Sequence, residues 1–292
     1  MDVLVTGASG FVGAVVAQEL HARGVAVTGL VRSPLVIEMP GIKTVCADLT
    51  DYDSVDRALS NSIFDAVVDT ASKIPTANSV DEDYLDNILM TRNLLRVLKK
   101  HLPGYFIKLS TIDVYKTGGV ITEQSEISLQ NYYALSKWAS EQNVELWGRE
   151  LKIPTCILRL SQIFGAGDRT RKFIPSIIQS IKERSKIYIN GDGLERRDYV
   201  YIRDAGSMIA DFCRMKAPGV FNLASGKSRS LNEVVEILQD VCDTKFQIEY
   251  RKRNKPRIDY EFDVTHLTAM LGEIKSTPFS EALRNTYFQM KL

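Results

Sequence analysis

A tyrosine and a lysine one helical turn apart are the residues of this chain best suited to acid–base chemistry. In "NYYALSKWASEQ" (131–142), Tyr133 precedes Lys137 by four residues, so on a helix the two side chains share one face. A free phenol has a pKa of about 10, and a nearby ammonium favours the phenolate. Tyr132 points about 100° away on such a helix and is expected to pack or to face a substrate. Because helices often carry this spacing for packing alone, the meaning of the pair depends on the surrounding elements.

Three glycines near the N-terminus form a second candidate site. "TGASGFVG" places Gly7, Gly10 and Gly13 between a predicted strand and a predicted helix. Such glycines permit a tight turn, a close approach of the backbone to a pyrophosphate, and close packing of helix on strand. The helix N-terminus then offers unpaired N–H groups to phosphates. We therefore expect a dinucleotide site whose loop contacts are Gly7, Ser9, Gly10, Phe11, Val12 and Gly13.

The residue after the second predicted strand bears on the choice of dinucleotide. Dinucleotide folds usually place an acidic residue there to bind the ribose 2′-hydroxyl, but this strand ends in "GLVRSP", with Val31 and then Arg32. A guanidinium can bind a 2′-phosphate, which a carboxylate would repel. The sequence predicts NADP(H) in preference to NAD(H), with Asp48 and Leu49 at the adenine ring.

The elements that must position these residues alternate between strand and helix. Short apolar runs at 3–7, 25–31, 63–71, 104–111 and 153–160 read as strands, and 11–23, 81–100 and 130–150 have helical periodicity. This order predicts an α/β fold of the Rossmann type, a doubly wound parallel sheet with a smaller C-terminal subdomain. We assign 1–164 and about 198–224 to the dinucleotide-binding domain, and about 165–197 and 225–292 to a substrate-binding subdomain. Ser230 and Glu233 predict a capped helix over 230–242.

The overall composition excludes several classes of protein. The 292 residues have a formal net charge of +1, and this small charge does not favour binding to nucleic acid or to an anionic membrane. Four separated cysteines and three histidines provide no metal-ligand spacing. There is no apolar run of about 18 residues to span a membrane. We expect a cytoplasmic protein without a metal site.

Several ordered motifs resemble the extended short-chain dehydrogenase/reductase superfamily, and within it the NAD(P)-dependent nucleotide-sugar epimerase/dehydratase/reductase branch. Besides the glycine loop and "YALSK", the chain contains "STIDVY" (110–115), "RLSQIFG" (159–165), "RDYVYIRDA" (197–205) and "FNLASG" (221–226). The resemblance covers essentially the whole chain.

The resemblance implies roles for particular residues. Thr111, Tyr133 and Lys137 match the catalytic hydroxyl, the acid/base phenol and the lysine, and the last two also match cofactor contacts. Further cofactor contacts are implied for Ala71, Ser72 and Asn87. Implied substrate contacts are Thr111, Gln162, Lys172, Phe173, Arg197 and Arg257. Arg197 and Arg257 would contact the diphosphate of the substrate, although Arg253 fits the second of these contacts as well as Arg257 does. Gln162 replaces an asparagine common in relatives.

Enzymes of this branch catalyse several different reactions. Dehydratases carry an Asp-Glu pair after the catalytic threonine, whereas this chain has Ile112 and Asp113, so elimination is disfavoured. Arg32 favours a reductase that draws on NADPH. We expect an NADPH-dependent 4-ketoreductase of an NDP-4-keto-6-deoxy sugar. An NDP-hexose 4-epimerase is the alternative, and a catalytically silent NADP-binding regulator is the alternative of another class. The resemblance also implies a homodimer.

Overall fold

The computed structural model describes residues 1–33, 39–74, 81–170, 172–253 and 256–290. The chain forms two compact units. The first comprises Met1–Tyr115, Ile127–Leu160 and Gly206–Phe221, and the second Lys116–Glu126, Ser161–Ala205 and Asn222–Leu292. No helix in the described part of the chain is both long and apolar enough to cross a bilayer.

The first unit is built on a seven-stranded sheet with the order β12-β7-β5-β4-β1-β2-β3. Its strands are β1 (Asp2–Thr6), β2 (Ala26–Val31), β3 (Lys43–Cys46), β4 (Ala66–Asp69), β5 (Phe106–Thr111), β7 (Thr155–Leu160) and β12 (Gly219–Leu223). The pairs from β3 to β7 are all parallel. Every residue of β4 and β5 is buried, as expected of strands covered on both faces. The predicted Rossmann-type fold is confirmed.

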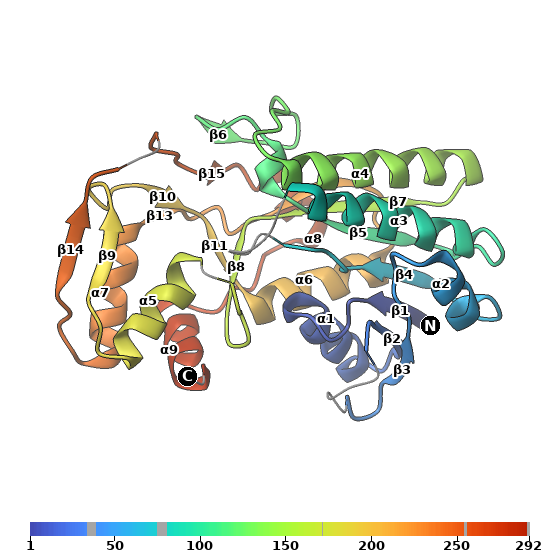
Figure 1. Ribbon diagram of the computed structural model, residues 1–292, viewed down its shortest axis with the longest axis horizontal. Coiled ribbons are helices and arrows are strands. Elements are labelled where there is room, and N and C mark those ends of the chain that lie inside the picture. The colour runs from blue at the N-terminus through green and yellow to red at the C-terminus, as the bar shows by residue number, and fades with distance from the viewer. Residues whose placement is uncertain (34–38, 75–80, 171, 254–255, 291–292) are drawn as a thin grey trace. The chain divides into compact units, whose positions relative to one another are not determined.

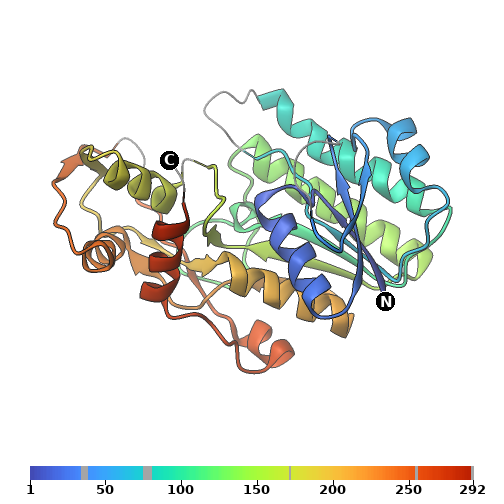
Figure 2. The same ribbon diagram turned by 90° about the horizontal axis from the view of Figure 1, so that it is seen from below.

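Helices cover both faces of this sheet (Figure 1). They are α1 (Phe11–Ala22), α2 (Tyr52–Leu59), α3 (Leu85–Leu98), α4 (Tyr132–Leu151) and α6 (Ile202–Met215), with short 3₁₀ turns η1 (Asp81–Tyr84) and η2 (Ile112–Val114). Arg23, the residue after α1, pairs with Asp211 of α6 at 2.6 Å, and these two helices lie side by side (Figure 2). α3 and α4 pack together on the opposite face.

The strand order reverses at β1, because β2 and β3 lie on one side of it and β4, β5 and β7 on the other. In open α/β sheets, ligands bind beyond the carboxyl ends of the strands at such a reversal. The glycine loop follows β1, and the segment from Thr70 to Lys73 follows β4. Thr111 ends β5, so these segments emerge at the same edge of the sheet.

The second unit contains shorter elements. They are β6 (Val120–Ile121), β8 (Gln162–Phe164), α5 (Phe173–Lys182), β9 (Ile187–Asn190), β10 (Arg196–Arg197), β11 (Tyr199–Tyr201), β13 (Arg229–Ser230), α7 (Leu231–Cys242), β14 (Ile248–Arg251), β15 (Glu261–Phe262), α8 (Thr265–Leu271) and α9 (Phe279–Gln289). The capping box of α7 is present as expected, with Ser230 and Glu233 each bonding the other's backbone.

The division between the units differs from the expected domain boundaries. β11 belongs to the second unit rather than the first because it pairs with β8. The segment 116–126 also belongs to the second unit, because β6 pairs with β15, which lies 141 residues later (120 to 261) in the chain. Strand pairing between distant segments cannot be seen from the local composition on which the boundaries rested.

Candidate active site

The glycine loop has a backbone shape that only small residues tolerate. Gly7 has φ +62°, and the N–H of Gly10 donates to its carbonyl at 2.8 Å. A Cβ at Gly13 would lie 2.3 Å from that same carbonyl oxygen. Helix α1 begins after Gly10 with no side-chain cap and no acidic residue in its first turn. The helix N-terminus therefore remains suited to an anion such as a pyrophosphate.

Arg32 follows β2 directly and is exposed. The hydroxyl and backbone N–H of Thr50 lower the pKa of the Asp48 carboxyl, with smaller contributions from the Arg32 guanidinium and from Lys73. Arg32 and Asp48 thus lie close enough to interact. The side chain of Leu49 packs in the hydrophobic core, and its contact with the adenine ring stays a prediction.

Asn87 fixes the segment that follows β4. Its Nδ2 donates to the carbonyl of Lys73 at 3.0 Å and to Ser136 Oγ at 3.1 Å, and its Oδ1 accepts from the backbone N–H of Lys73 at 2.7 Å. The side chain is buried, and both ends of its amide contact protein. The described contacts of Asn87 therefore hold the segment of Ala71 and Ser72 against α4.

Thr111 and Tyr133 meet at the end of β5. Asn131 caps α4 by accepting from the N–H of Ala134 at 2.8 Å, which places Tyr133 in the first turn. The hydroxyls of Thr111 and Ser72 lie near the Tyr133 phenol and act on its ionisation. Tyr132 points away and is 51% exposed, as the helical spacing predicts. Ser72, expected only as a cofactor contact, thus also touches the candidate acid/base residue.

Lys137 lies on the same helix face as Tyr133 and is buried. Its Nζ donates to the carbonyl of Leu109, in β5, at 2.7 Å. Burial lowers the pKa of Lys137 to about 7, and the cation of Lys108 contributes to the lowering. The candidate lysine is therefore fixed next to β5 in surroundings that disfavour its charge.

The protein itself raises the pKa of Tyr133, whereas the sequence suggested a lowered value. Burial is the largest cause, followed by the carboxylate of Asp113. The neighbouring hydroxyls of Ser72 and Thr111 act in the opposite direction. At neutral pH the phenol is therefore protonated, which suits a proton donor.

Two residues beside Tyr133 were given no catalytic role in the sequence interpretation. Asp113, in η2, is partly buried and lies near the phenol. Tyr84 packs edge-on against the Tyr133 ring with the ring centroids 5.9 Å apart. The signal for Asp113 was its place two residues after Thr111, but the sequence carries no comparable signal for Tyr84.

The predicted substrate residues other than Thr111 lie in the second unit. Gln162 begins β8, Lys172 is the residue before α5, and Phe173 is the first residue of that helix. Arg197 donates to the carbonyl of Ile258, and its guanidinium lies 4.9 Å from the centroid of the Tyr260 ring.

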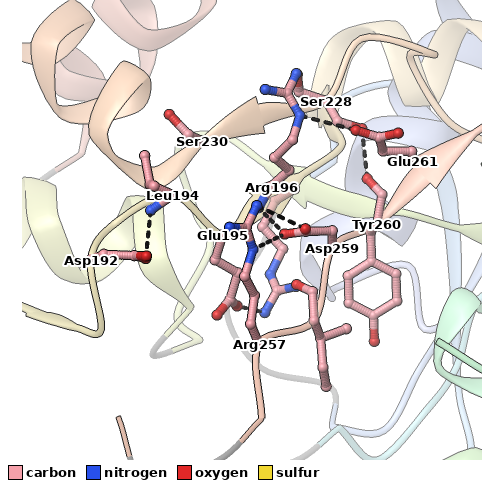
Figure 3. A network of polar contacts seen from close by, with 12 residues as sticks. Asp192, Leu194, Glu195, Arg196, Ser228, Ser230, Arg257, Asp259, Tyr260 and Glu261 are labelled. Atoms are coloured by element: carbon pink, nitrogen blue, oxygen red, sulfur yellow. Dashed lines mark hydrogen bonds and ion pairs between the residues drawn. The ribbon is translucent and has the colours of Figure 1, made fainter. Parts of the chain in front are cut away.

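Three arginines of this unit differ in their carboxylate partners. Arg197 pairs with Oε1 of Glu195, and Arg253 pairs with Oε2 of the same residue at 2.9 Å. Arg257 instead pairs with Asp259 at 2.8 Å (Figure 3). Arg253 thus shares a carboxylate partner with Arg197, and Arg257 also lies near Arg197, because both act on the carboxylate of Asp259.

Known proteins resemble this chain over most of its length. The model of the family described as "NAD dependent epimerase/dehydratase family" matches residues 3–224. A Methanocaldococcus jannaschii protein provisionally named UDP-glucose 4-epimerase is 26% identical, with 87% of this chain and 86% of that protein covered. A dTDP-glucose 4,6-dehydratase of Streptomyces niveus is 22% identical, covering 98% of this chain and 91% of its own.

A solved structure shows the same fold. The Thermus thermophilus UDP-glucose 4-epimerase, solved as a complex with NAD, superposes with a TM-score of 0.87 at 22% identity, covering 99% of this chain and 98% of its own. The family model spans more than two thirds of the chain, including the glycine loop, Thr111, Tyr133 and Lys137. On this match and the fold, the chain belongs to the NAD-dependent epimerase/dehydratase family.

Proposed function

We propose that this protein transfers hydride at C4 of the hexose in a nucleotide-diphosphate sugar, as an NADPH-dependent reductase of an NDP-4-keto-6-deoxy sugar. The observation that carries the proposal is the meeting of Thr111, Ser72 and Tyr133 at the end of β5, with Lys137 on the same face of α4. Hydroxyl donors grouped in this way can hold a carbonyl oxygen and protonate it as charge develops.

The first unit offers features that fit a nicotinamide dinucleotide. The uncapped N-terminus of α1 and the tight glycine loop suit its pyrophosphate. Arg32 would hold a 2′-phosphate, which favours NADP(H) over NAD(H). When bound, the reduced nicotinamide supplies the hydride.

Thr111, Tyr133 and Lys137 would each have a separate role in the reduction. Thr111 orients the ketone oxygen, and Tyr133 gives its phenolic proton to that oxygen as the C4–H bond forms. The raised pKa of Tyr133 supports this direction because it keeps the phenol protonated at neutral pH. Lys137 would hold the nicotinamide ribose and stabilise the phenolate left behind, which regains its proton from solvent.

The second unit would bind the nucleotide diphosphate. Arg197 and Arg253 share Glu195, so two guanidinium groups lie near one another, a suitable arrangement for a diphosphate. Lys172 and Phe173 would add contacts at the N-terminus of α5, and Gln162 would contact the sugar.

A 4-epimerase is the second candidate function, and the Methanocaldococcus jannaschii relative favours it. An epimerase would oxidise C4 and return the hydride to the opposite face, without net consumption of cofactor. A silent NADP-binding regulator is disfavoured by the grouped Thr111, Tyr133 and Lys137.

One pair of incubations separates the candidates. The purified protein with NADPH and an NDP-4-keto-6-deoxyhexose should consume NADPH, which is followed at 340 nm, whereas UDP-glucose should be left unchanged. Formation of UDP-galactose without consumption of NADPH would establish the epimerase instead. Cofactor binding without turnover of either sugar nucleotide would support the regulator.

Replacing the phenol tests the assigned proton donor. Tyr133→Phe should lower kcat by roughly two to four orders of magnitude, because the proton donor is lost, while the affinity for NADPH measured by fluorescence stays within a few-fold of the parent value. Tyr132→Phe is the matched control and should retain full activity, since that side chain points to solvent. Comparable activity of both variants would place the chemistry elsewhere.

A further inference from the structure

An ion pair is buried beneath the candidate active site. Lys108 of β5 and Asp69 of β4 are direct neighbours in the sheet register, and each is 2% exposed. Lys108 Nζ lies 2.6 Å from Asp69 Oδ2. The surrounding residues of both strands are mostly apolar, in "AVVD" and "FIKLST".

The pair belongs to a continuous chain of hydrogen bonds. Lys108 also donates to Thr91 Oγ1, in α3, at 3.0 Å. Asp69 Oδ1 accepts from the hydroxyl of Thr6, in β1, at 2.6 Å, and Thr6 Oγ1 accepts from the N–H of Ala71 at 3.2 Å. Thr6 immediately precedes Gly7. The chain therefore links α3 and three strands to the glycine loop and to the segment after β4.

Lys108 also lies beside the residue that holds Lys137, since the carbonyl of Leu109 accepts from Lys137 Nζ. The charged groups that act on Lys137 are Lys108 in β5, Asp69 in β4 and Glu141 on α4 itself. Glu141 is in turn paired with Arg159 of β7 at 2.7 Å. Of these three groups, Lys108 carries a positive charge and the other two carry negative charges.

Stability alone does not explain the pair. Apolar residues of similar volume usually replace a buried ion pair at little cost or with a gain in stability, because both charges must be desolvated. Strands β4 and β5 already carry such residues next to the pair, at Val68, Ile107 and Leu109.

We propose that Lys108 and Asp69 are positioning residues: they hold the glycine loop against the segment after β4, and they set the charge environment of Lys137. This inference rests on the proposed function. The pair is assigned no contact with cofactor or substrate, and acts through Thr6, Ala71 and Lys137.

Opposite single substitutions should shift the titration of Lys137 in opposite directions. Asp69→Asn removes a neighbouring negative charge and should lower the pKa of Lys137, whereas Lys108→Met removes a neighbouring cation and should raise it. The shift is read from the ¹³Cε resonance of Lys137 in protein labelled with ¹³C-lysine as a function of pH, with Lys137→Arg identifying the signal. A residue with a purely structural role would not produce two shifts of opposite sign.

The double variant Lys108→Met/Asp69→Leu separates positioning from stability. Because both charges are removed together, its melting temperature should stay within a few degrees of the parent value. Its affinity for NADPH should still fall roughly tenfold, because Thr6 loses its acceptor and the glycine loop is held less firmly. The pKa of Lys137 should rise in this variant, since Lys108 acts on it more strongly than Asp69 does.

The exposed pair Lys100–Asp56 provides the matched control, and Lys100→Met/Asp56→Leu should change neither measurement. Parent-like cofactor affinity or an unmoved pKa of Lys137 in the folded double variant would overturn the proposal, even if a single variant failed to fold. Both readouts are independent of sugar turnover. Failure of the proposed reductase activity would therefore be recognised separately.

Discussion

Lys137 occupies surroundings in which its charge costs free energy. Burial lowers the pKa of its ammonium to about 7, against an ordinary value of 10.5. Between these two pH values the unfolded chain binds a proton that the folded protein does not, so stability rises with pH across this window. Below pH 7 both states bind the proton and the cost is constant. A shift of this size corresponds to a few kcal/mol, on the order of 1.4 kcal/mol for each pH unit.

Removing the ammonium should therefore stabilise the protein while removing its activity. Lys137→Met should raise the melting temperature at pH 7 by several degrees, and the gain should shrink as the pH approaches 10. Thermal unfolding followed by circular dichroism at pH 7 and pH 9.5 measures both effects. A variant less stable than the parent at pH 7, or a gain that grows with pH, would contradict the lowered pKa.

Arg32 provides a residue-scale test of the cofactor assignment. Arg32→Ala should weaken NADPH binding by about tenfold or more, because a charge-assisted contact to the 2′-phosphate is lost, and should leave NADH binding unchanged. Arg57→Ala is the control, since Arg57 is also exposed but lies on α2. Equal losses for NADPH and NADH, or tighter binding of NADH by the parent protein, would remove the basis for NADP(H).

At the scale of the element, α4 is held to the sheet by a buried carboxylate. Glu141 lies one turn beyond Lys137, accepts from the hydroxyl of Ser110 in β5, and pairs with Arg159 of β7 through two guanidinium nitrogens. Arg159 also donates to the phenol of Tyr115 at 2.8 Å. Ser110 adjoins Thr111, so these contacts fix the end of β5 relative to the helix that carries Tyr133.

Breaking this buried contact should be costly. Glu141→Gln leaves the Arg159 guanidinium without its counter-charge and should lower the free energy of unfolding by about 3–5 kcal/mol, measured by urea titration. Asp56→Asn disrupts the exposed pair with Lys100 and should cost less than about 1 kcal/mol. Similar costs for the two variants would show that the buried charges are solvated despite their low exposure.

Elements with a strong local pattern were predictable from the sequence. The helix expected over 11–23 is α1, the strand expected over 25–31 is β2, and the strand expected over 104–111 is β5, which begins two residues later at Phe106. The long run at 63–71 shortens to β4, with 63–65 and 70–71 outside the strand. α6 was missed because "RDYVYIRDA" begins as a strand, and the helix starts only at Ile202.

The contacts of the candidate site were only partly predictable. Gly7, Gly10 and Gly13 follow from local steric rules, and the spacing of Tyr133 and Lys137 follows from helix geometry. The partners Asp69 and Lys108 could not be found, because they are 39 positions apart and pair only once β4 and β5 become neighbours. The raised pKa of Tyr133 was also beyond sequence reasoning, since it depends mainly on burial.

At the scale of the whole molecule, the proposed ligands divide between the two compact units. The residues assigned to the dinucleotide, from Gly7 to Lys137, belong to the first unit, and the arginines assigned to the diphosphate belong to the second. If each unit binds its own ligand, substitutions in one unit should leave the affinity for the other ligand largely unchanged.

The choice between Arg253 and Arg257 tests this division. Arg253 shares Glu195 with Arg197, and its side chain is 20% exposed, whereas Arg257 is 41% exposed and pairs with Asp259. Arg253→Ala should therefore raise the dissociation constant for UDP and dTDP roughly tenfold or more by calorimetry, because a charge-assisted contact to the diphosphate is lost, while NADPH affinity stays at the parent value. Arg257→Ala is the matched control and should change the nucleotide affinity by less than about threefold. The reverse order would assign the contact to Arg257, and a parallel loss of NADPH affinity in Arg253→Ala would show that the two units do not bind their ligands independently.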